Sequence, residues 1–344
     1  MRASEKLNSV HFMRFFAAMA VVVHHVTTGF GNKRVMVGAA GVDVFFVISG
    51  IVIGMSLLRE EAPYNFAVKR MIRVLPLYWI ATAASVLFVY STWGELPTTE
   101  ELARSLLLWP KFGTDWHAIY FPAWTLTYEM LFYCVAGAIL VASRKHAWTA
   151  TLVIFTLIGL FRIPVPGTDG AFFSTAVCLE FCMGLAIAPL IVCGWRPSTF
   201  AGIAMIAIGA IFAWSYQDDV LLITEQASRA HLARPLQLGL PCALIVAGML
   251  AFDSASWMRE KVIELGGDAS YAIYVTHITT INFVSDRLLR HGIDPKGHPV
   301  TMQIALIVLS LGVGVCTRLF VERPLLDYLR NLLLGRSTRA VTVA

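Results

Sequence analysis

About ten apolar runs, each roughly long enough to cross a lipid bilayer as a helix, constrain this chain of 344 residues more than any other feature. Hydrophobic residues make up 57% of the chain and charged residues 14%, and the mean hydropathy is +0.69. A soluble globule of this size would need more polar surface. We therefore predict an all-α, polytopic transmembrane helical bundle of about ten spans, forming a single integral-membrane domain over residues 1–344. The apolar runs lie at roughly 10–29, 36–58, 74–92, 122–142, 147–164, 171–194, 199–215, 236–252, 269–286 and 301–321.

The orientation of the bundle follows from lysine and arginine in short loops, because positively charged loops stay on the cytoplasmic side. The loop 59–73 is rich in these residues, and later loops on the same side of the predicted membrane, with the C-terminal tail, add more. Arg287, Arg290 and Lys296 fall on the opposite side. The balance predicts that both termini are cytoplasmic. The formal net charge of +5 then reflects topology and does not indicate nucleic-acid binding.

The six cysteines of the chain lie within or at the ends of apolar runs. None of them forms a Cys-x-x-Cys motif or has histidines at the spacing of a zinc site. We interpret them as small buried hydrophobic residues and predict neither structural disulfides nor a metal site. The cysteines are Cys134, Cys178, Cys182, Cys193, Cys242 and Cys316.

Arg14 and His25 are the most informative polar residues, because both lie in the first apolar run, HFMRFFAAMAVVVHHV. Their spacing brings an α-helix to within about 20° of a whole number of turns, so both side chains share one face, roughly 16 Å apart. A charge inside a membrane helix costs a few kcal/mol or more, so the pair predicts an intramembrane site. His24 points about 100° away from His25 and is the weaker candidate. The run has no small-residue cleavage site, so we expect it to be retained rather than removed as a signal peptide.

Glu129 lies about two helical turns below the outer surface if the fourth run enters the membrane near Pro122. His25 lies near the outer end of the first run, so the two side chains can meet at one depth. A carboxylate partner fixes the tautomer of a histidine and raises its basicity, as a general base requires. The alternative is that Arg14, His25 and Glu129 form a buried polar network that only fixes helix packing.

Arg70 and Arg73 form a second cluster, in the segment FAVKRMIRVLPLYW. Residues three apart are neighbours on a helix face, and this face lies at the cytoplasmic entrance to the third span. Guanidinium forks suit phosphate groups, such as the pyrophosphate of a nucleotide. Taken alone, the pattern favours ordinary anchoring of a cytoplasmic loop at lipid headgroups.

Further polar residues lie in or beside the apolar runs. Asp43 and Ser49 lie on different faces of the second span, and the charge makes Asp43 the better candidate for a cavity while Ser49 suits helix packing. We expect Glu180 to pair with a buried cation and Glu322 to pair with its neighbour Arg323, both in structural roles.

Tyr274 and His277 are three residues apart in the ninth span, so they share a face and can line the same cavity. A buried histidine with satisfied hydrogen bonds is an equal alternative for His277. Trp124 and Tyr128 fit an aromatic belt at the membrane surface as well as a platform for stacking a sugar.

Seven segments, taken in order, resemble the membrane acyltransferase family 3, and in particular its exopolysaccharide and O-antigen acetyltransferases. The resemblance covers nearly the whole chain. The opening segment lacks the glycine that many members have after the arginine-bearing start, a departure that affects packing and leaves the charged positions intact. The segments are MRFFAAMAVVVHH, GVDVFFVISGIVI, FAVKRMIRVLPLYW, AWTLTYEMLFY, LEFCMGLAIA, LGGDASYAIYVTH and FVERPL.

The resemblance implies roles for the residues that match the family motifs. The Arg-ten residues-His signature falls on Arg14 and His25, and the Arg-x-x-Arg motif falls on Arg70 and Arg73. The glutamate of the W-x-L-x-x-E segment is Glu129. Four further matches come from the segment S-Y-x-I-Y-x-x-H, which falls on Ser270, Tyr271, Tyr274 and His277.

The family implies a membrane O-acyltransferase of the bacterial inner membrane that takes acetyl from cytoplasmic acetyl-CoA. The acceptor is a hydroxyl of an extracytoplasmic or lipid-linked glycan, and polysaccharide assembly machinery is an expected partner beside membrane lipid. By this resemblance, Arg70 and Arg73 hold the nucleotide end of the donor, His25 removes the hydroxyl proton, and Glu129 orients or charge-compensates it. Arg14 stabilises the thioester end of the donor or the polar network that it forms with His25 and Glu129. Direct transfer and an acyl-histidine intermediate both fit, as do acetyl and succinyl donors.

Two other functional classes use the same charged residues. A transporter or proton-relay protein would place Arg14, His25 and Glu129 along an ion path. A scaffold of a polysaccharide assembly complex would need none of them for chemistry. The sequence contains no inverted repeat and no pair of Gly/Pro-broken helices in matching positions, which disfavours the transporter.

Overall fold

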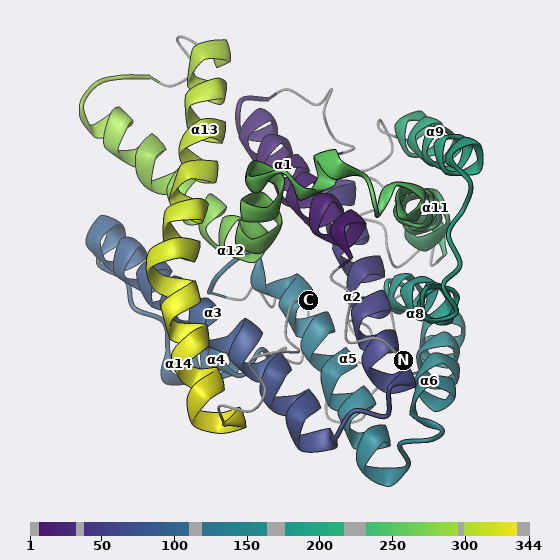
Figure 1. Ribbon diagram of the computed structural model, residues 1–344. Coiled ribbons are helices and arrows are strands. Elements are labelled where there is room, and N and C mark those ends of the chain that lie inside the picture. The colour runs from purple at the N-terminus through teal and green to yellow at the C-terminus, as the bar shows by residue number, and fades with distance from the viewer. Residues whose placement is uncertain are drawn as a thin grey trace.

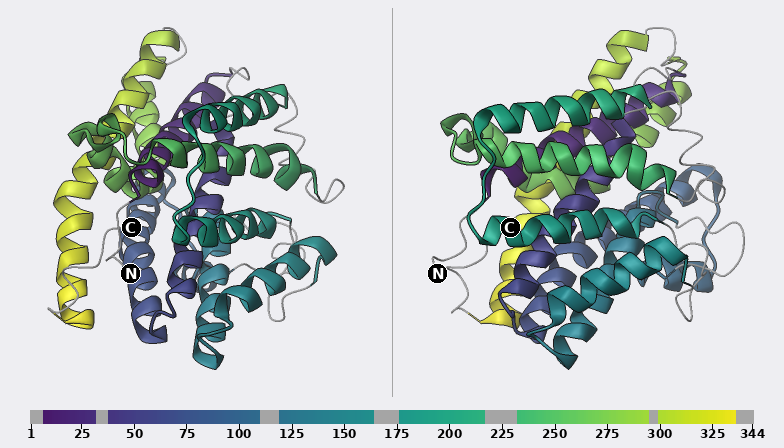
Figure 2. Two further views of the ribbon diagram at one scale, coloured as in Figure 1. Left: turned by 45° about the vertical axis from the view of Figure 1, so that its right-hand side comes forward. Right: turned by 90° about the vertical axis from the view of Figure 1, so that its right-hand side faces the viewer.

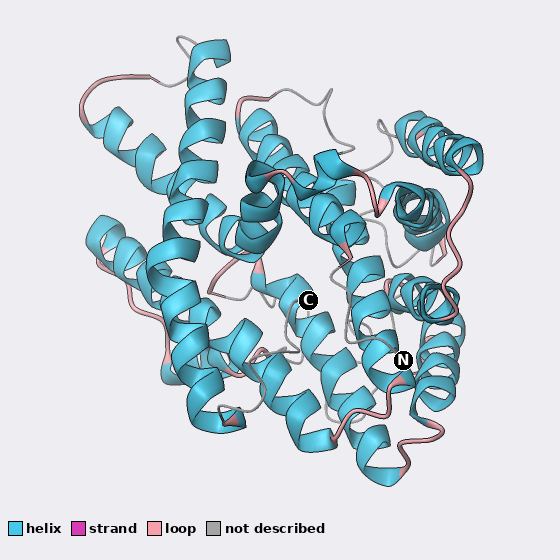
Figure 3. Ribbon diagram, in the orientation of Figure 1, coloured by secondary structure: helices cyan, strands magenta, loops and turns pink. Residues whose placement is uncertain are grey.

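The computed structural model describes residues 7–31, 38–109, 119–163, 176–216, 232–294 and 299–335. Every regular element within these ranges is a helix, drawn in cyan in Figure 3, which confirms the predicted all-α class. The main helices are α1 (Asn8–Gly29), α2 (Gly41–Leu58), α3 (Pro63–Trp93), α5 (Ala123–Ala142), α6 (Ala147–Phe161), α8 (Cys178–Val192), α9 (Thr199–Ser215), α11 (Leu240–Met249), α12 (Lys261–Arg290), α13 (Pro299–Thr317) and α14 (Arg323–Leu334). Shorter elements are α4 (Thr99–Leu106), η2 (Pro235–Gly239), η3 (Leu250–Phe252), η4 (Ser256–Arg259) and η6 (Arg318–Glu322).

Each predicted apolar run overlaps one of these helices. In the described part of the chain, 6 helical stretches are long and apolar enough to cross a membrane: α1, α2, α3, α5, the stretch Pro235–Phe252 and the stretch Pro299–Leu334. Three shorter apolar helices are α6, α8 and α9. The protein is therefore a helical membrane protein, whereas ten spans and cytoplasmic termini stay predictions. Lys296 and the tail beyond residue 335 lie outside the described residues.

Helix α3 begins at Pro63, well before the predicted start of the third run at residue 74. Proline suits the first turn of a helix because the amide hydrogen that it lacks has no helical partner there. The early start places Arg70 and Arg73 inside the helix, where they face its packed side rather than a loop.

The helices form a bundle in which α1 packs against α2, α12 and α13. Helices α6, α8, α9 and α11 form a stack that is seen end-on at the right of Figure 1 and lengthwise in the right panel of Figure 2. The continuous stretch of α13, η6 and α14 runs along the opposite side of the molecule (Figure 1). The helices α1, α2 and α5 lie between these two sides (Figure 1).

Helices α2 and α8 pack closely because both carry glycine at their contact. A methyl group at Gly50 would overlap the backbone oxygen of Phe181, and one at Gly184 would overlap that of Val47. Small residues that let backbones approach in this way are typical of helix pairs in membranes. Aromatic rings fill the space beside this contact, with Phe181 lying 4.9 Å from Phe46 between ring centroids.

Candidate active site

A cavity between α1, α2, α3, α5 and α12 is lined by most of the predicted site residues, and its empty space, including the part open to the surroundings, is about 810 Å³. Its charged lining residues are Arg14, Arg70, Arg73 and Glu129, and we call it the arginine cavity. The other lining residues are Val42, Phe45, Phe46, Ile48, Ser49, Val52, Ile53, Val74, Thr125, Leu126, Tyr133, Tyr271 and Tyr274.

Arg70 lies in the wall of the cavity, held by one hydrogen bond and two aromatic rings. Its Nη2 donates to Ser56 Oγ at 3.0 Å. Its guanidinium carbon lies 5.6 Å from the ring centroid of Phe66 and 5.9 Å from that of Tyr133. Its buried Nε has no hydrogen-bond partner among the described residues. The N–H group at Nε of Arg70 is therefore available to donate a hydrogen bond to a ligand.

Arg73 is ion-paired, with its Nη1 2.5 Å from Glu322 Oε1. Glu322 also lies 3.5 Å from Arg318 Nη1, one turn earlier in η6. We expected Glu322 to pair with Arg323, but η6 is a π-helical turn, and within it the carboxylate faces Arg73 and Arg318 instead. The carboxylate is 2% exposed, so the bundle interior, not the membrane surface, holds this pair.

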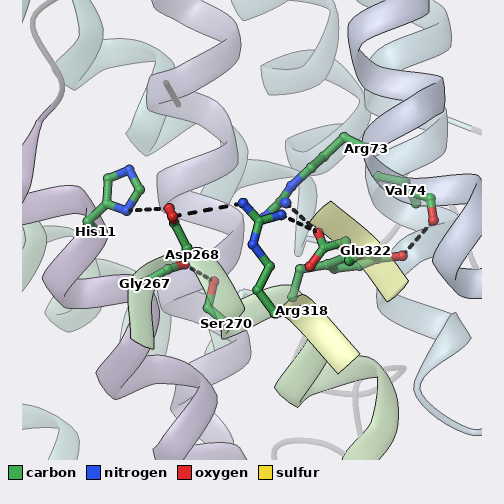
Figure 4. Close-up of polar contacts among 9 residues, drawn as sticks. His11, Arg73, Val74, Gly267, Asp268, Ser270, Arg318 and Glu322 are labelled. Atoms are coloured by element: carbon green, nitrogen blue, oxygen red, sulfur yellow. Dashed lines mark hydrogen bonds and ion pairs between the residues drawn. The ribbon is translucent and has the colours of Figure 1, made fainter. Parts of the chain in front are cut away.

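The ion pairs continue from Arg318 to the start of α1. Arg318 Nη2 lies 3.8 Å from Asp268 Oδ2, and Asp268 Oδ1 lies 3.6 Å from His11 Nδ1. Figure 4 shows this row of side chains running from His11 through Asp268 and Arg318 to Glu322 and Arg73. The row connects α1, α12, η6 and α3, so it couples the position of Arg73 to three other helical elements.

Glu129 lies on α5 and points into the cavity. Its Oε1 accepts a hydrogen bond from Ser49 Oγ at 3.0 Å and a second one from the hydroxyl of Tyr133. Ser49, which we interpreted as a packing hydroxyl, therefore lines the cavity and contacts Glu129. Tyr133 lies four residues after Glu129, so the next turn of the same helix supplies this donor.

Asp43, which we expected at the cavity, is instead fully buried in an ion pair outside it. Arg234 Nε donates to Asp43 Oδ1 at 3.0 Å, and Arg234 Nη2 donates to Asp43 Oδ2 at 3.2 Å. Glu180 Oε1 lies 3.8 Å from Arg234 Nε, which confirms that Glu180 pairs with a buried cation. We call Asp43, Arg234 and Glu180 the buried triad. Sequence reasoning missed Arg234, although two carboxylates in apolar runs require a cation nearby.

Arg14 projects from α1 into the cavity, and its Nε is buried without a hydrogen-bond partner among the described residues. Glu129, in the same cavity, accepts its hydrogen bonds from Ser49 and Tyr133. Three arginines thus face two carboxylates, Glu129 in the cavity wall and Glu322 behind Arg73. The resulting excess of positive charge favours an anionic occupant.

His25 lies against His277 rather than against Glu129. The ring centroids of His25 and His277 are 5.2 Å apart, and Phe121 lies 5.9 Å from His25 on another side. In the described part of the chain, no hydrogen bond or ion pair joins His25 to Glu129, and His25 is not among the residues that line the cavity. The prediction from helix depth therefore gave His25 a different neighbour, Glu129, from the one that it has in the structure.

His277 links His25 to the cavity through Tyr274. His277 Nδ1 lies 2.6 Å from the backbone oxygen of Tyr274, so Nδ1 carries the proton and donates it. His277 Nε2 is buried and has no hydrogen-bond partner within the described ranges. Tyr274 lines the cavity, and its hydroxyl lies 2.7 Å from Thr125 Oγ1. Tyr274, His277 and His25 thus form a row that leads outward from the cavity.

Across the described residues, no group of three or more histidine, cysteine, aspartate or glutamate side chains is placed to hold a metal ion. The charged groups of the site are arginines and isolated carboxylates. This arrangement can bind an anion and can move a proton at an imidazole.

Residues 7–319 match the protein family described as "Acyltransferase domain". The chain is 31% identical over 326 residues to the exopolysaccharide production protein ExoZ of Rhizobium meliloti (strain 1021), covering 90% of this chain and 94% of that protein. It is 22% identical to the acyltransferase MdmB of Streptomyces mycarofaciens, over 81% of this chain and 80% of the relative. It is 26% identical to nodulation protein 10 of Rhizobium leguminosarum bv. viciae, over 60% of this chain and 50% of the relative.

No solved structure matches the chain significantly. The family match extends over most of the chain, from the start of α1 into η6, and so includes every residue that lines the arginine cavity. With the similarity to ExoZ over nearly the full length of both chains, it shows that this protein belongs to the membrane acyltransferase family 3.

Proposed function

We propose that this protein is an O-acetyltransferase of the bacterial inner membrane that moves an acetyl group from cytoplasmic acetyl-CoA to a hydroxyl of an extracytoplasmic or lipid-linked glycan. One observation carries the proposal. Arg14, Arg70 and Arg73 converge on a single cavity in the bundle, and Tyr274 connects that cavity to the His277–His25 pair.

The donor site is the arginine cavity. Acetyl-CoA carries several phosphate charges on its nucleotide end, and arginine binds phosphate through paired N–H donors. Arg70 and Arg73 lie three residues apart on α3 and face the cavity together. A phosphate that approaches Arg73 competes with Glu322, and Arg318 is positioned to keep the carboxylate neutralised.

Arg14 receives the thioester end of the donor. It lies on α1 eleven residues before His25, and its buried Nε lacks a partner among the described residues. Its guanidinium holds the donor inside the cavity, below the histidine pair, by a charge-assisted hydrogen bond. Glu129, held by Ser49 and Tyr133, offsets the charge of the arginines rather than that of His25.

Transfer takes place at the histidine pair. His25 removes the proton from the acceptor hydroxyl, and the hydroxyl oxygen attacks the thioester carbonyl carbon. The carbon–sulfur bond breaks, the proton passes from His25 to the departing sulfur, and the products are the acetyl ester and free CoA. His277 orients His25: its Nδ1 donates to the backbone oxygen of Tyr274, and its ring packs against the His25 ring with the centroids 5.2 Å apart.

The acceptor class rests on the names of the relatives. ExoZ is an exopolysaccharide production protein, nodulation protein 10 bears a nodulation name, and MdmB is an acyltransferase. A glycan hydroxyl fits the first of these names and the histidine chemistry alike. Polysaccharide assembly machinery is the expected partner of such an enzyme.

Two measurements test the donor and base assignments. Binding of radiolabelled acetyl-CoA to the purified full chain in detergent is expected to weaken about 100-fold in the Arg70→Ala, Arg73→Ala double variant, since two charge-assisted contacts are lost. Arg104→Ala is the matched control, because Arg104 pairs with Glu100 on α4 and does not line the cavity. Unaltered binding in the double variant would contradict the donor site.

The base is tested in cells through the acetyl ester content of the polysaccharide. His25→Ala is expected to lower it about 10²- to 10⁴-fold, the usual contribution of a general base, while the protein still accumulates in the membrane. A transporter or scaffold that uses the same charges would leave glycan acetylation unchanged, so normal acetyl content in this variant would reject the proposal.

A further inference from the structure

A second hollow lies beyond the His25–His277 pair, between the end of α1 and the second half of α12. This groove holds about 990 Å³ of empty space, open to the surroundings on one side. Its lining residues are Val26, Gly29, Phe30, Ile281, Asn282, Ser285, Leu289 and Asp294.

The histidine pair separates the groove from the arginine cavity along both helices. On α1, Arg14 lines the cavity and precedes His25, whereas Val26, the residue directly after His25, lines the groove. On α12, Tyr274 lines the cavity one turn before His277, and Ile281 lines the groove one turn after it. The histidine pair lines neither hollow, but on both helices it lies between residues that line the cavity and residues that line the groove.

The two hollows differ in chemistry. The groove wall offers the amide of Asn282, the hydroxyl of Ser285 and the carboxylate of Asp294, which together donate to and accept from hydroxyl groups. Phe30 adds an aromatic face of the kind that packs on the apolar side of a sugar ring. None of the described lining residues is lysine or arginine. Such a wall suits a neutral polyhydroxyl compound and offers no cation to a phosphate.

We propose that this groove binds the sugar unit that receives the acetyl group and presents its hydroxyl to His25. The proposal rests on the acyltransferase function proposed above and adds the place of the acceptor. With the donor in the arginine cavity and the acceptor in the groove, the two substrates meet at the histidine pair without sharing a binding site. The predicted topology puts the ends of α1 and α12 on the outer face, where an extracytoplasmic glycan is found.

Gly29 allows the groove to be filled without disturbing the packing of the protein. It lines the groove, and a Cβ built there meets no atom within 4 Å. A tryptophan at this position therefore extends into the groove. Gly312 on α13 is the matched control, because a Cβ there also meets no atom within 4 Å and Gly312 lies outside both hollows.

Two assays separate the donor half of the reaction from the acceptor half. Gly29→Trp is expected to bind radiolabelled acetyl-CoA as the wild type does, in the purified full chain. In a bacterial host that lacks its own copy of this chain, it is expected to lower ester-linked acetate on the polysaccharide about 100-fold, since a blocked acceptor cannot reach the base. Gly312→Trp is expected to leave both measurements unchanged.

A second variant removes contacts instead of adding bulk. Asn282→Ala combined with Ser285→Ala is expected to lower polysaccharide acetate about tenfold, because two hydrogen-bonding groups are lost, while acetyl-CoA binding persists. Asp286→Asn on the same helix is its control, since Asp286 pairs with Arg290 at 2.8 Å outside the groove. If Gly29→Trp fails to accumulate, the double variant and its control, Asp286→Asn, test whether the groove is the acceptor site.

The outcomes distinguish the two proposals. If the wild type binds acetyl-CoA and acetylates the polysaccharide, and the groove variants acetylate equally well, the groove is not the acceptor site and the proposed function stands. If the wild type neither binds acetyl-CoA nor changes the acetate content, the proposed function fails and the acceptor site fails with it.

Discussion

The arginine cavity and the buried triad are built from the same residue types, arginine and acidic side chains, inside the same bundle. In the triad, one arginine lies between two fully buried carboxylates, with two hydrogen bonds to Asp43 at 3.0 and 3.2 Å. In the cavity, three arginines line about 810 Å³ of empty space, and Arg14 and Arg70 keep buried Nε atoms without partners among the described residues.

The difference shows that a charge in an apolar helix is not by itself a sign of a binding site. Asp43 and Arg14 are equally conspicuous in the sequence, and each lies in an apolar run. Asp43 is satisfied by Arg234, so its charge holds helices together. Arg14 faces empty space, so its charge is available to a ligand. Pairing and adjacent volume, not charge, separate structural from functional residues here.

Removing the cation of the buried triad is expected to have the largest effect on folding. Arg234→Ala leaves two buried carboxylates without a counter-ion, which costs about 3–5 kcal/mol of stability. The variant should lose its folded peak in size-exclusion chromatography after mild heating in detergent. A matched triple variant, Asp43→Asn, Glu180→Gln and Arg234→Met, has no charged side chain in the triad. This variant should keep its folded peak in the same chromatography. A stable Arg234→Ala protein would contradict the structural role.

Removing Arg14 is expected to do the opposite, with little loss of stability and a large loss of transfer. Loss of one charge-assisted hydrogen bond to the donor costs about 1.5–3 kcal/mol, or roughly 10- to 150-fold in transfer at limiting acetyl-CoA. The melting temperature should stay near the wild-type value, because the buried Nε of Arg14 makes no hydrogen bond to the described residues that would be lost. The measurement is acetyl transfer from radiolabelled acetyl-CoA beside a thermal melt. A destabilised Arg14 variant with normal acetyl transfer would show that Arg14 has a structural role, as the residues of the buried triad do.

The sequence predicted the helices and singled out the charged cavity residues because these follow from local pattern. Ten apolar runs overlap described helices, and Arg14, Arg70, Arg73 and Glu129, which the sequence divided between two clusters, all line one cavity. Depth along a helix follows from residue count and membrane thickness. These predictions needed no knowledge of which helices are neighbours.

Partner choice could not be predicted in the same way, because it depends on how helices are rotated and which ones touch. His25 and Glu129 share a predicted depth, yet His25 faces His277 on α12. Asp43 and Ser49 face different directions on α2, and only the packing of the neighbouring helices decides that Ser49 reaches the cavity. The π-helical turn η6 turns Glu322 toward Arg73, which a regular helical pattern does not foretell.

Substitution of His277 also tests the distinction between structural and functional residues, with a smaller expected effect. His277 is buried like the triad, but its Nε2 has no hydrogen-bond partner among the described residues, like the Nε atoms of Arg14 and Arg70. His277→Asn retains a donor for the backbone oxygen of Tyr274 and removes the ring beside His25. The transfer rate should fall about tenfold, because the imidazole ring that packs against His25 and orients it is replaced by a smaller amide. The rate measured against pH separates the two roles: an altered pH profile supports orientation of His25, whereas an unaltered profile with lower stability supports packing alone.

Tyr274→Phe is expected to have the smallest effect on stability and transfer. It tests whether a cavity residue whose hydrogen bonds are satisfied has a structural role, as the buried triad does. Tyr274 lines the cavity, but its hydroxyl already has two partners, Thr125 Oγ1 at 2.7 Å and the backbone oxygen of Pro122 at 3.3 Å. Its loss should cost about 0.5–1.5 kcal/mol of stability for each hydrogen bond removed. Acetyl-CoA affinity should stay unchanged, because the ring that shapes the cavity remains. A large fall in affinity with normal stability would mean that this hydroxyl binds the donor directly, and that a paired group can also belong to the site.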